Sequence, residues 1–414
     1  MLTAYLKLAW KVLLRRKFFT FISLFGISFT LMVLMVITAM YQNTTSSLKP
    51  DTRFDRCLFI DRAKMDLANS NGRRVSPPGY QFLHEYVRPM ETPENVSVFT
   101  RGRGTYAYKD DRKYEMNLKR TDGQYWEIMD FSFLEGTAFT REDEERGNMV
   151  MVINEATREQ YFNGEPAVGK QLVIDGQTFR VVGVVPNVPE YRQTSYADVW
   201  VPISTNKSSH YRKELMGGFG AILLAKSPAD FEAIKDELEA LLPGVQLPDP
   251  KKWNKFTATV DTRKEMMVRG FTNTWERDPG IGKVTMILLG VMLAFMLLPA
   301  INLININMSR IMERSAEIGV RKAFGATSSK LTVQFLIENL VVSLCGGLVG
   351  FGLSAIVLTF IENSGVIPYA NLGVDLTIFV IGMVITVIFG LVSGVYPAWR
   401  MSRPHPVVAL KGGV

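Results

Sequence analysis

Hydrophobic residues along this chain gather into four long runs separated by polar sequence. A helix needs roughly 20 apolar residues to cross the hydrocarbon core of a membrane. Stretches of at least about that length, each without Lys or Arg, are 18–41, 284–308, 331–361 and 374–398. The third run is long enough to tilt, and it contains Glu338 near its start. The pattern predicts an α-helical membrane protein with four transmembrane helices.

The first run could instead be a secretory signal peptide, because a basic segment precedes it. A signal peptide has an apolar region of about 7 to 15 residues followed by a small-residue cleavage site. The run 18–41 is longer than that, and no clear cleavage site follows Ala39. We therefore expect an uncleaved membrane anchor.

Basic residues in the short connecting segments predict the orientation, since cytoplasmic loops carry an excess of Lys and Arg. Segments 1–17, 309–330 and 399–414 contain five, five and three of them, and 362–373 contains none. We expect the cell (inner) membrane, with both termini cytoplasmic and with 42–283 and the short loop 362–373 outside.

The N-terminal segment 1–17 has a second property besides its charge. Its apolar positions form one stripe of a helix, while Lys7, Lys11 and Arg15 repeat every four residues on another. Such an amphipathic helix lies on a membrane surface and contacts lipids. A basic topology signal with no further role explains the same residues, and both interpretations stay open.

The polar segment 42–283 alternates short strands with helices, which predicts an α+β extracytoplasmic domain. We expect two subdomains, with the middle of the segment inserted into a unit formed by its two ends. The predicted helices are Pro78–Val87, Asn154–Phe162 and Ser227–Leu242, and the predicted strands are Cys57–Ile60, Val96–Thr100, Tyr106–Tyr108, Met149–Ile153, Gln171–Ile174, Thr178–Val185, Asp198–Pro202, Ala221–Lys226 and Phe256–Val260.

The net charge of +7 could indicate a nucleic-acid partner, so its location matters. Segment 42–283 carries 34 of the 47 basic residues and 35 of the 40 acidic residues, which gives a net charge of 34 − 35 = −1. The positive excess therefore lies in the short segments beside the apolar runs. A nucleic-acid binder would carry it on a folded domain, so we expect no nucleic acid.

Catalytic and metal-binding patterns are not found in the sequence. Cys57 and Cys345 lie in different regions, and two cysteines make neither a disulfide framework nor a zinc site. His84, His210 and His405 have no partners at ligand spacing. The acidic run Glu142–Glu145 is interpreted as a solvated turn. We expect no enzyme activity, no metal and no cofactor in this chain.

One segment imitates a nucleotide-binding motif. The sequence of Gly164–Gln171, GEPAVGKQ, matches all but the last position of the phosphate-binding loop GxxxxGK[ST]. That loop needs a Ser or Thr hydroxyl for Mg²⁺ and a following helix whose amides face the phosphates. Here Gln171 replaces the hydroxyl and a strand is predicted to follow. We interpret the segment as a turn between a helix and a strand.

The segment 309–330 predicts a short charged helix along the inner membrane surface. On a helix Glu313, Glu317 and Arg321 share one face, and Glu317 before Arg321 is the favourable i,i+4 order. Gly325 is well placed to end the helix. A rigid helix of this kind could transmit force from a docked protein. An interfacial connector that only satisfies the charge rule has the same spacing.

The same segment carries a family resemblance. Arg314, Glu317-Ile318-Gly319, Arg321-Lys322-Ala323 and Gly325-Ala326 closely resemble the signature of the FtsX/MacB-like ABC transporter permease family. The C-terminal Gly394–Ala398 and Pro406–Leu410, and the N-terminal Ala9-Trp10 with Arg15–Lys17, are similar to that family too. Within 42–283, Val181–Val185 looks like its periplasmic module. The resemblance covers nearly the whole chain.

The resemblance implies an arrangement and a set of partners. Such permeases have four spans, a large MacB-like periplasmic core domain after the first, and a cytoplasmic ATPase bound at the helix between spans two and three. They pair, here as a homodimer or as a heterodimer with a related permease. The residues expected to couple to the ATPase are Arg310, Glu313, Arg314, Glu317, Gly319, Arg321, Lys322 and Gly325.

In the MacB-like branch the resemblance implies mechanotransmission, in which ATP hydrolysis by the partner moves the outer domain. The ATPase would here be a separate polypeptide, so ATP is used by the partner and not by this chain. A periplasmic adaptor and an outer-membrane channel are further expected partners in efflux.

Small residues also indicate close helix packing. Gly346-xxx-Gly350 and Gly390-xxx-Gly394 are small-xxx-small patterns that let two helices approach closely. Such pairs pack helices between two subunits or within one subunit, and the sequence leaves both interpretations open.

Three functions remain as hypotheses. The first is the permease of an ABC transporter that exports or extracts a hydrophobic substrate such as a peptide, an antibiotic or a lipoprotein. The second is an FtsX-like transmembrane regulator of cell-wall hydrolases or division. The length of 42–283 favours the first, since the outer domains of FtsX-type proteins look smaller. A membrane-anchored enzyme has the least support.

Overall fold

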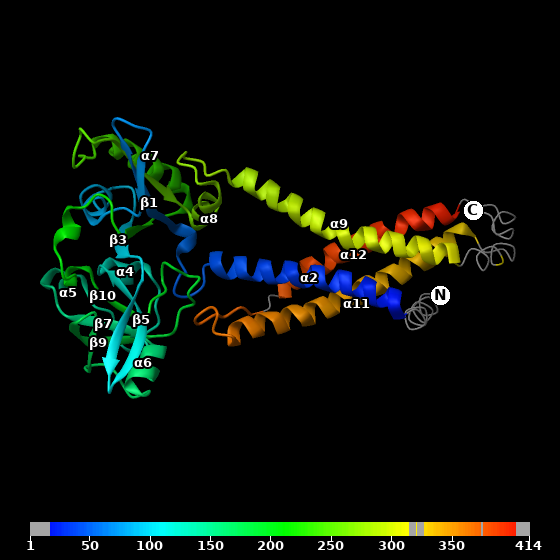
Figure 1. Cartoon of the computed structure of the whole chain (residues 1–414), viewed down its shortest axis with the longest axis horizontal. Coiled ribbons are helices and arrows are strands. Elements are labelled where there is room, and N and C mark those ends of the chain that lie inside the picture. Colours follow the sequence, from blue (N-terminus) through cyan, green and yellow to red (C-terminus); the bar gives the residue numbers. More distant parts are fainter. Residues whose placement is uncertain (1–16, 314–319, 321–326, 374–375, 403–414) are drawn as a thin grey trace. The chain divides into compact units, whose positions relative to one another are not determined.

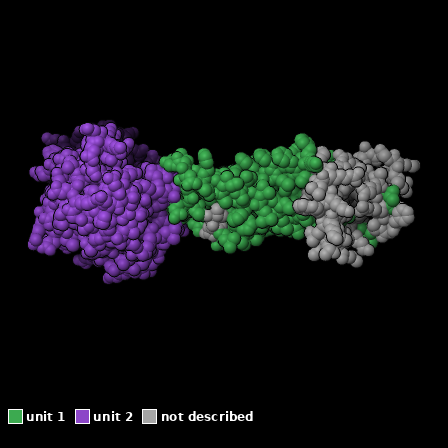
Figure 2. Space-filling view, turned by 90° about the horizontal axis from the view of Figure 1, so that it is seen from below, with its two compact units in different colours: residues 1–43, 282–366, 371–414 green, residues 44–281, 367–370 purple. Residues whose placement is uncertain are grey.

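The chain divides into two compact units, coloured separately in Figure 2. The computed structural model describes residues 17–313, 320, 327–373 and 376–402. We call residues 44–281 with 367–370 the sheet domain, which is described throughout, and the rest of the chain the helix unit. The sheet domain begins and ends within two residues of the predicted segment 42–283.

Long apolar helices make up the described part of the helix unit (Figure 1). Three of them contain a stretch long and apolar enough to cross a membrane, namely Thr20–Thr45, Ile281–Leu298 and Thr332–Asn363, and Leu376–Val392 is a shorter apolar stretch in another. Four crossings therefore remain a prediction. The helices are α2 (Lys17–Thr45), α9 (Ile281–Glu313), α11 (Ser328–Asn363) and α12 (Leu376–Ser402).

The sheet domain is built on one connected set of strands in the order β10-β7-β9-β8-β4-β5-β3-β11-β1-β12, with β2 beside β1 and β6 beside β9. Because β10 also pairs in parallel with β5, six of these strands close into a ring. The strands are β1 (Cys57–Leu67), β2 (Arg73–Ser76), β3 (Asn95–Thr100), β4 (Arg103–Lys109), β5 (Arg112–Thr121), β6 (Glu135–Gly136), β7 (Val150–Asn154), β8 (Gln171–Ile174), β9 (Gln177–Val185), β10 (Val199–Pro202), β11 (Phe219–Leu224) and β12 (Trp253–Asp261).

The hydrophobic core consists of separate clusters, and two of them correspond to the two predicted subdomains. The two ends of the segment share one cluster, in which Leu58, Leu223 and Ile234 are fully buried. The middle of the segment fills the strand ring with a second cluster that includes Phe179. A third cluster around Trp200 lies where the two meet. The predicted α+β content is confirmed, although the strands run on from one part to the other through the β3–β5 pair.

Each predicted strand has a counterpart, and local chemistry explains the helices. Asn154 caps α6 by accepting a hydrogen bond from the Thr157 amide, as its sequence position predicted. Gly164–Lys170 forms a turn between α6 and β8, which confirms that interpretation. The helices of the sheet domain are α3 (Tyr80–Phe82), α4 (Gln124–Ile128), α5 (Arg141–Arg146), α6 (Glu155–Phe162), α7 (Phe231–Leu241) and α8 (Arg263–Thr272).

One of the predicted elements was wrong, and another is shorter than predicted. The acidic run 142–145 is not a solvated turn but lies in α5, where Thr140 and Asp143 form a capping box and Gly147 ends the helix with a positive φ of 66°. The predicted helix Pro78–Val87 begins two residues later, at Tyr80, and α3 continues directly into the π-helical turn Leu83–Val87.

Candidate functional site

Most of the predicted ATPase-coupling residues lie outside the described residues. Arg314, Glu317, Gly319, Arg321, Lys322 and Gly325 belong to this group, as do positions 1–16 of the predicted amphipathic helix. Arg310 and Glu313 fall in the last turn of α9. The coupling role of these residues stays a prediction.

Three of the four predicted packing glycines lie at helix contacts within this chain. A Cβ atom on Gly346 would come within 2.8 Å of Ile27, and one on Gly350 within 2.9 Å of the Ser28 carbonyl oxygen, both on α2. A Cβ on Gly390 of α12 would come within 2.0 Å of the Ser343 hydroxyl on α11. Gly394 lies in α12, and its contacts are outside the described part. A role between subunits stays a prediction.

The sheet domain meets the helices along the chain at three places, which we call junctions 1, 2 and 3. Junction 1 is residues 44–51, which begin with the last two residues of α2. Junction 2 is residues 274–277, before α9, and junction 3 is residues 367–370, between α11 and α12. All three belong to the sheet domain. Polar side chains of that domain bind the backbone at junctions 1 and 2, and at junction 3 the domain binds the Tyr369 side chain and the Pro368 carbonyl.

At junction 1 the buried Arg192 and the partly buried Arg263 bind the backbone. Arg192 donates to the Leu48 carbonyl at 2.8 Å, and its Nη1 lies 3.2 Å from Asp51 Oδ2. Arg263 Nε donates to the Thr44 carbonyl at 3.1 Å. Since both arginines come from distant parts of the sequence, junction 1 is fixed to the folded domain as well as to its own neighbours.

The electrostatics of junction 1 are dominated by burial. Asp51 is 2 % exposed, and desolvation raises its pKa despite the nearby Arg263 and Arg192. Lys119 donates from Nζ to the carbonyls of residues 193 and 194, both at 2.7 Å, and burial lowers the pKa of Lys119 to about 7. One carboxylate therefore faces three basic groups. Backbone carbonyl oxygens accept many of the hydrogen bonds that these three groups donate.

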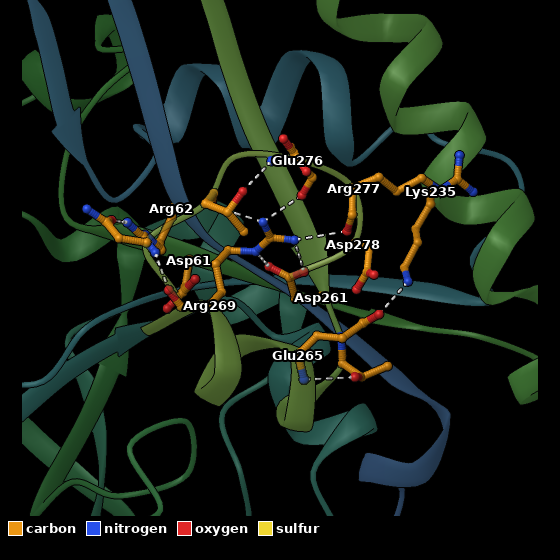
Figure 3. Close-up of polar contacts among 12 residues, drawn as sticks. Asp61, Arg62, Lys235, Asp261, Glu265, Arg269, Glu276, Arg277 and Asp278 are labelled. Carbon is orange, nitrogen blue, oxygen red and sulfur yellow. Dashed lines mark hydrogen bonds and ion pairs between the residues drawn. The ribbon is translucent and has the colours of Figure 1, made fainter. Parts of the chain in front are cut away.

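At junction 2 a single guanidinium organises the backbone (Figure 3). Arg269 of α8, 1 % exposed, forms a two-pronged ion pair with Asp261 at the end of β12, with both N–O distances 2.7 Å. Its three remaining N–H groups donate to the carbonyls of Thr274, Glu276 and Arg277 at 3.1, 2.8 and 3.1 Å. All five donors of the guanidinium are thus used, and junction 2 is bonded to the last strand.

Further ion pairs surround Arg269 (Figure 3). Lys235 of α7 lies 2.7 Å from Glu265, which also closes the capping box of α8. Arg277 pairs with Glu232 and Asp236 of α7, each at 2.5 Å. Helices α7 and α8 and junction 2 are therefore linked to one another as well as to the sheet.

At junction 3 the loop between α11 and α12 is bonded to the domain through Tyr369. Its hydroxyl donates to Asp198 Oδ1 at 2.9 Å, and the Glu190 amide donates to the Pro368 carbonyl at 3.1 Å. Tyr369 adopts a positive φ of 56°, which is uncommon for a residue with a side chain. The surrounding contacts hold the loop in that conformation.

Asp198 is the acceptor at the centre of junction 3. It is 8 % exposed and also accepts from the Asn117 amide at 2.7 Å and from Asn154 Nδ2 at 2.9 Å. Burial raises the pKa of Asp198, and burial beside that carboxylate raises the pKa of Tyr369. The three donors compensate for the water that the carboxylate has lost.

Sequence reasoning named none of the residues that bind these junctions. Arg192 lies in an irregular segment with no periodicity, so nothing in the sequence distinguished it from a surface arginine. The position of Arg269 on a helix could have been predicted, because Thr262 followed by Glu265 is a capping-box signal for the start of α8. Among the described residues no cluster of three metal-ligating side chains is present.

Two family models match this chain. The MacB-like periplasmic core domain matches residues 20–241, and the FtsX-like permease C-terminal region matches residues 289–406. Together they cover α2, most of the sheet domain and the helices that follow it.

Curated relatives are similar over much of the chain. The uncharacterized ABC transporter permease YknZ of Bacillus subtilis (strain 168) is 27% identical over 291 residues, which are 69% of this chain and 68% of YknZ. The macrolide export ATP-binding/permease protein MacB of Bdellovibrio bacteriovorus is 24% identical over 324 residues, 77% of this chain and 47% of MacB. The match thus spans less than half of that longer relative.

Solved structures are similar at low identity. The periplasmic region of MacB from Actinobacillus actinomycetemcomitans aligns with 52% of this chain and 94% of its own length, at 16% identity and a TM-score of 0.36.

Proposed function

This chain belongs to the family of ABC transporter permeases with a MacB-like periplasmic core domain and an FtsX-like permease C-terminal region, and from that premise we propose that it is a transmembrane subunit that moves its sheet domain. A separate cytoplasmic ATPase supplies the energy. Movement of the sheet domain outside the cell membrane drives export or extraction of a hydrophobic substrate, such as a peptide, an antibiotic or a lipoprotein.

The observation that carries this proposal is the bonding of the three junctions. A flexible linker absorbs a displacement, because it can change its end-to-end distance at little cost. Here junctions 1, 2 and 3 are instead bonded to distant parts of the domain through buried Arg192, Arg269 and Asp198 and through the partly buried Arg263. A displacement that reaches a junction along the chain is therefore passed to the whole domain.

The separate ATPase is part of the proposal for two reasons. The relatives named MacB are described as ATP-binding/permease proteins, which indicates ATP as the source of energy. In this sequence the nearest match to a nucleotide-binding loop, Gly164–Gln171, forms a turn and a strand. We assign ATP binding to a partner that docks on the segment 309–330 at the cytoplasmic surface.

The membrane arrangement in this proposal has four spans and cytoplasmic termini. Support comes from the apolar helices α2, α9, α11 and α12 and from the basic residues next to them in the sequence. Two permease chains pair as a homodimer or a heterodimer. A periplasmic adaptor and an outer-membrane channel complete the efflux assembly.

Co-purification with the ATPase tests the docking segment. Glu317→Lys and Arg321→Glu reverse charges on one face of the predicted helix, and each should reduce recovery of the ATPase with the tagged permease by about tenfold. Lys411→Glu in the C-terminal tail is the matched control and should leave recovery unchanged. Full recovery with both docking variants would refute the role of this segment.

An FtsX-like regulator of cell-wall hydrolases or division is the second candidate, because the C-terminal model that matches residues 289–406 is named for FtsX. Deletion of the gene distinguishes the two. Loss of tolerance to peptides or antibiotics with normal division supports export, whereas chained or filamentous cells with unchanged tolerance support regulation.

A further inference from the structure

A cavity of about 430 Å³ lies in the sheet domain where the strand ring meets the rest of the sheet. It is lined by the end of β3, the start of β4, the end of β5, the β8–β9 turn and the start of β11, with part of the loop after β10. No junction residue lines it. The cavity is therefore separate from the three junctions.

Positive charge dominates the lining of this cavity. Arg101, Arg103, Arg120 and Lys207 all line it, and Asp175 is its one carboxylate, every lining residue being described. The Asp175 carboxylate lies 3.2 Å from Arg103, 3.6 Å from Arg120 and 3.3 Å from Lys207. Three cations thus converge on one carboxylate and cannot all be neutralised by it.

Arg101 does not change this imbalance. It pairs at 3.2 Å with Asp61, which is outside the lining. Four cations against two carboxylates leave an excess of two positive charges around the cavity. An anion bound there would be attracted by every basic group and would lower their mutual repulsion.

Among the residues that line the cavity, Arg120 is buried and held in place by hydrogen bonds. It is 8 % exposed, its Nη1 donates to Thr205 Oγ1 at 2.8 Å, and its Nη2 donates to Gln177 Oε1 at 3.4 Å. These bonds fix the guanidinium plane, so little side-chain freedom is lost when a ligand binds. The more exposed Arg103 and Lys207, at 69 % and 52 %, can reach toward a ligand.

The lining also has an apolar side, formed by Leu118 and Phe219. Ligand sites typically combine apolar walls with a few convergent polar groups that fix the orientation of the ligand. Guanidinium groups match the planar oxygen pairs of carboxylates and phosphates. The combination fits an organic anion better than a neutral or cationic molecule.

We propose that this cavity binds a small organic ligand through its carboxylate or phosphate group, with Arg103, Arg120 and Lys207 as the binding residues. The site is additional to the proposed transport function and does not depend on it. A purely structural role, in which Asp175 and the basic groups only join the β8–β9 turn to β4 and β5, is the competing account.

Calorimetric titration of the purified full chain in detergent tests the proposal. The probes are citrate, which carries carboxylates, and inorganic phosphate, each compared with sodium chloride at equal ionic strength. We expect saturable binding of at least one probe. Arg103→Gln and Lys207→Gln, both exposed enough to leave the fold intact, should each weaken that binding about tenfold or more.

Arg74→Gln is the matched control, because Arg74 is an exposed arginine on β2 and does not line the cavity. It should leave binding unchanged. Binding of citrate alone identifies a carboxylate ligand, binding of phosphate alone identifies a phosphate ligand, and binding of both supports a site for either group. No saturable binding beyond sodium chloride, or equal binding by wild type and Lys207→Gln, would overturn the proposal in favour of the structural role.

Discussion

At the residue scale, the sheet domain buries charged groups, and each of them has only a few hydrogen-bond or ion-pair partners. Arg269 and Asp261 are 1 % exposed each and satisfy each other, and the remaining donors of Arg269 go to backbone carbonyls. Such a pair is not strong evidence of extra stability, because desolvation offsets much of the attraction. Its value is that it fixes where junction 2 lies.

Removing one partner of this pair should be costly. Arg269→Gln leaves Asp261 buried without its cation, so we expect the free energy of unfolding of the sheet domain to fall by about 3–5 kcal/mol. Urea denaturation of the full chain in detergent, followed by tryptophan fluorescence, measures it. Arg277→Gln in the exposed network beside it should change little, and an equal loss in both variants would contradict the special role of Arg269.

Tyr369 gives a prediction specific to junction 3. Tyr369→Phe removes one donor to the buried Asp198, and a hydrogen bond to a charged group is worth about 1.5–3 kcal/mol. The loop should detach more often, so the Glu190 amide, which is bonded to the Pro368 carbonyl, should exchange its hydrogen at least about tenfold faster. Hydrogen exchange with mass spectrometry measures this, and an unchanged rate at Glu190 would contradict the contact.

Lys119 predicts a pH dependence of stability. Its pKa is about 7 in the folded chain, against about 10.4 for an unfolded lysine. Between these values the unfolded state binds more protons, so the contribution of Lys119 to the free energy of unfolding rises with pH from about 7 to about 10. Below about 7 both states are protonated and the contribution stays at its least favourable value.

Lys119→Met should abolish that rise. We expect the free energy of unfolding of wild type minus that of the variant to increase steadily across denaturation curves recorded at pH 7, 8, 9 and 10. A difference in the free energy of unfolding that stays constant over this pH range would show that Lys119 keeps its ordinary pKa.

At the element scale, glycines allow the long helices to approach one another closely. Gly350 of α11 faces the backbone of α2, whereas Gly352, two residues later, has no atom within 4 Å of where its Cβ would be. The small-xxx-small pattern predicted that Gly346, Gly350 and Gly390 lie at packed surfaces. It could not say which helix they contact, because the pattern is the same for contacts within and between subunits.

The two glycines allow a matched experiment on one helix. Gly350→Ala should destabilise the helix unit, since the new methyl would sit 2.9 Å from the Ser28 carbonyl oxygen and 3.2 Å from Leu31. Gly352→Ala should cause no loss and can gain up to about 1 kcal/mol from helix propensity. Thermal unfolding in detergent compares them, and equal effects of the two would contradict the α2–α11 contact.

The accuracy of the predicted elements follows the strength of their local signals. Strands with alternating or continuous apolar residues, such as β8 and β9, were predicted to within a residue or two. Strand β5 was missed because its first half, Arg112–Glu115, is mostly charged, and its pairing with β4 and β10 comes from partners distant in sequence. The residues of the three junctions were missed for the same reason, since their roles depend on tertiary contacts.

At the scale of the whole molecule, the family assignment and the junctions support one account. The sheet domain is a single bonded body with three junctions, each of which continues along the chain into a long apolar helix. If the segment 309–330 lies on the ATPase side of the membrane, force applied there reaches the domain through α9 and junction 2. The account requires that this segment and the sheet domain lie on opposite sides.

The most direct test is accessibility labelling of two positions in intact cells. Ser315→Cys places a thiol in the predicted docking segment, and Ala229→Cys places one on an exposed turn of the sheet domain, with the native Cys57 and Cys345 replaced by Ser. A thiol reagent that cannot cross the cell membrane should label position 229 and should label position 315 only after the membrane is opened. Labelling of both positions in closed cells, or of neither, would contradict the account.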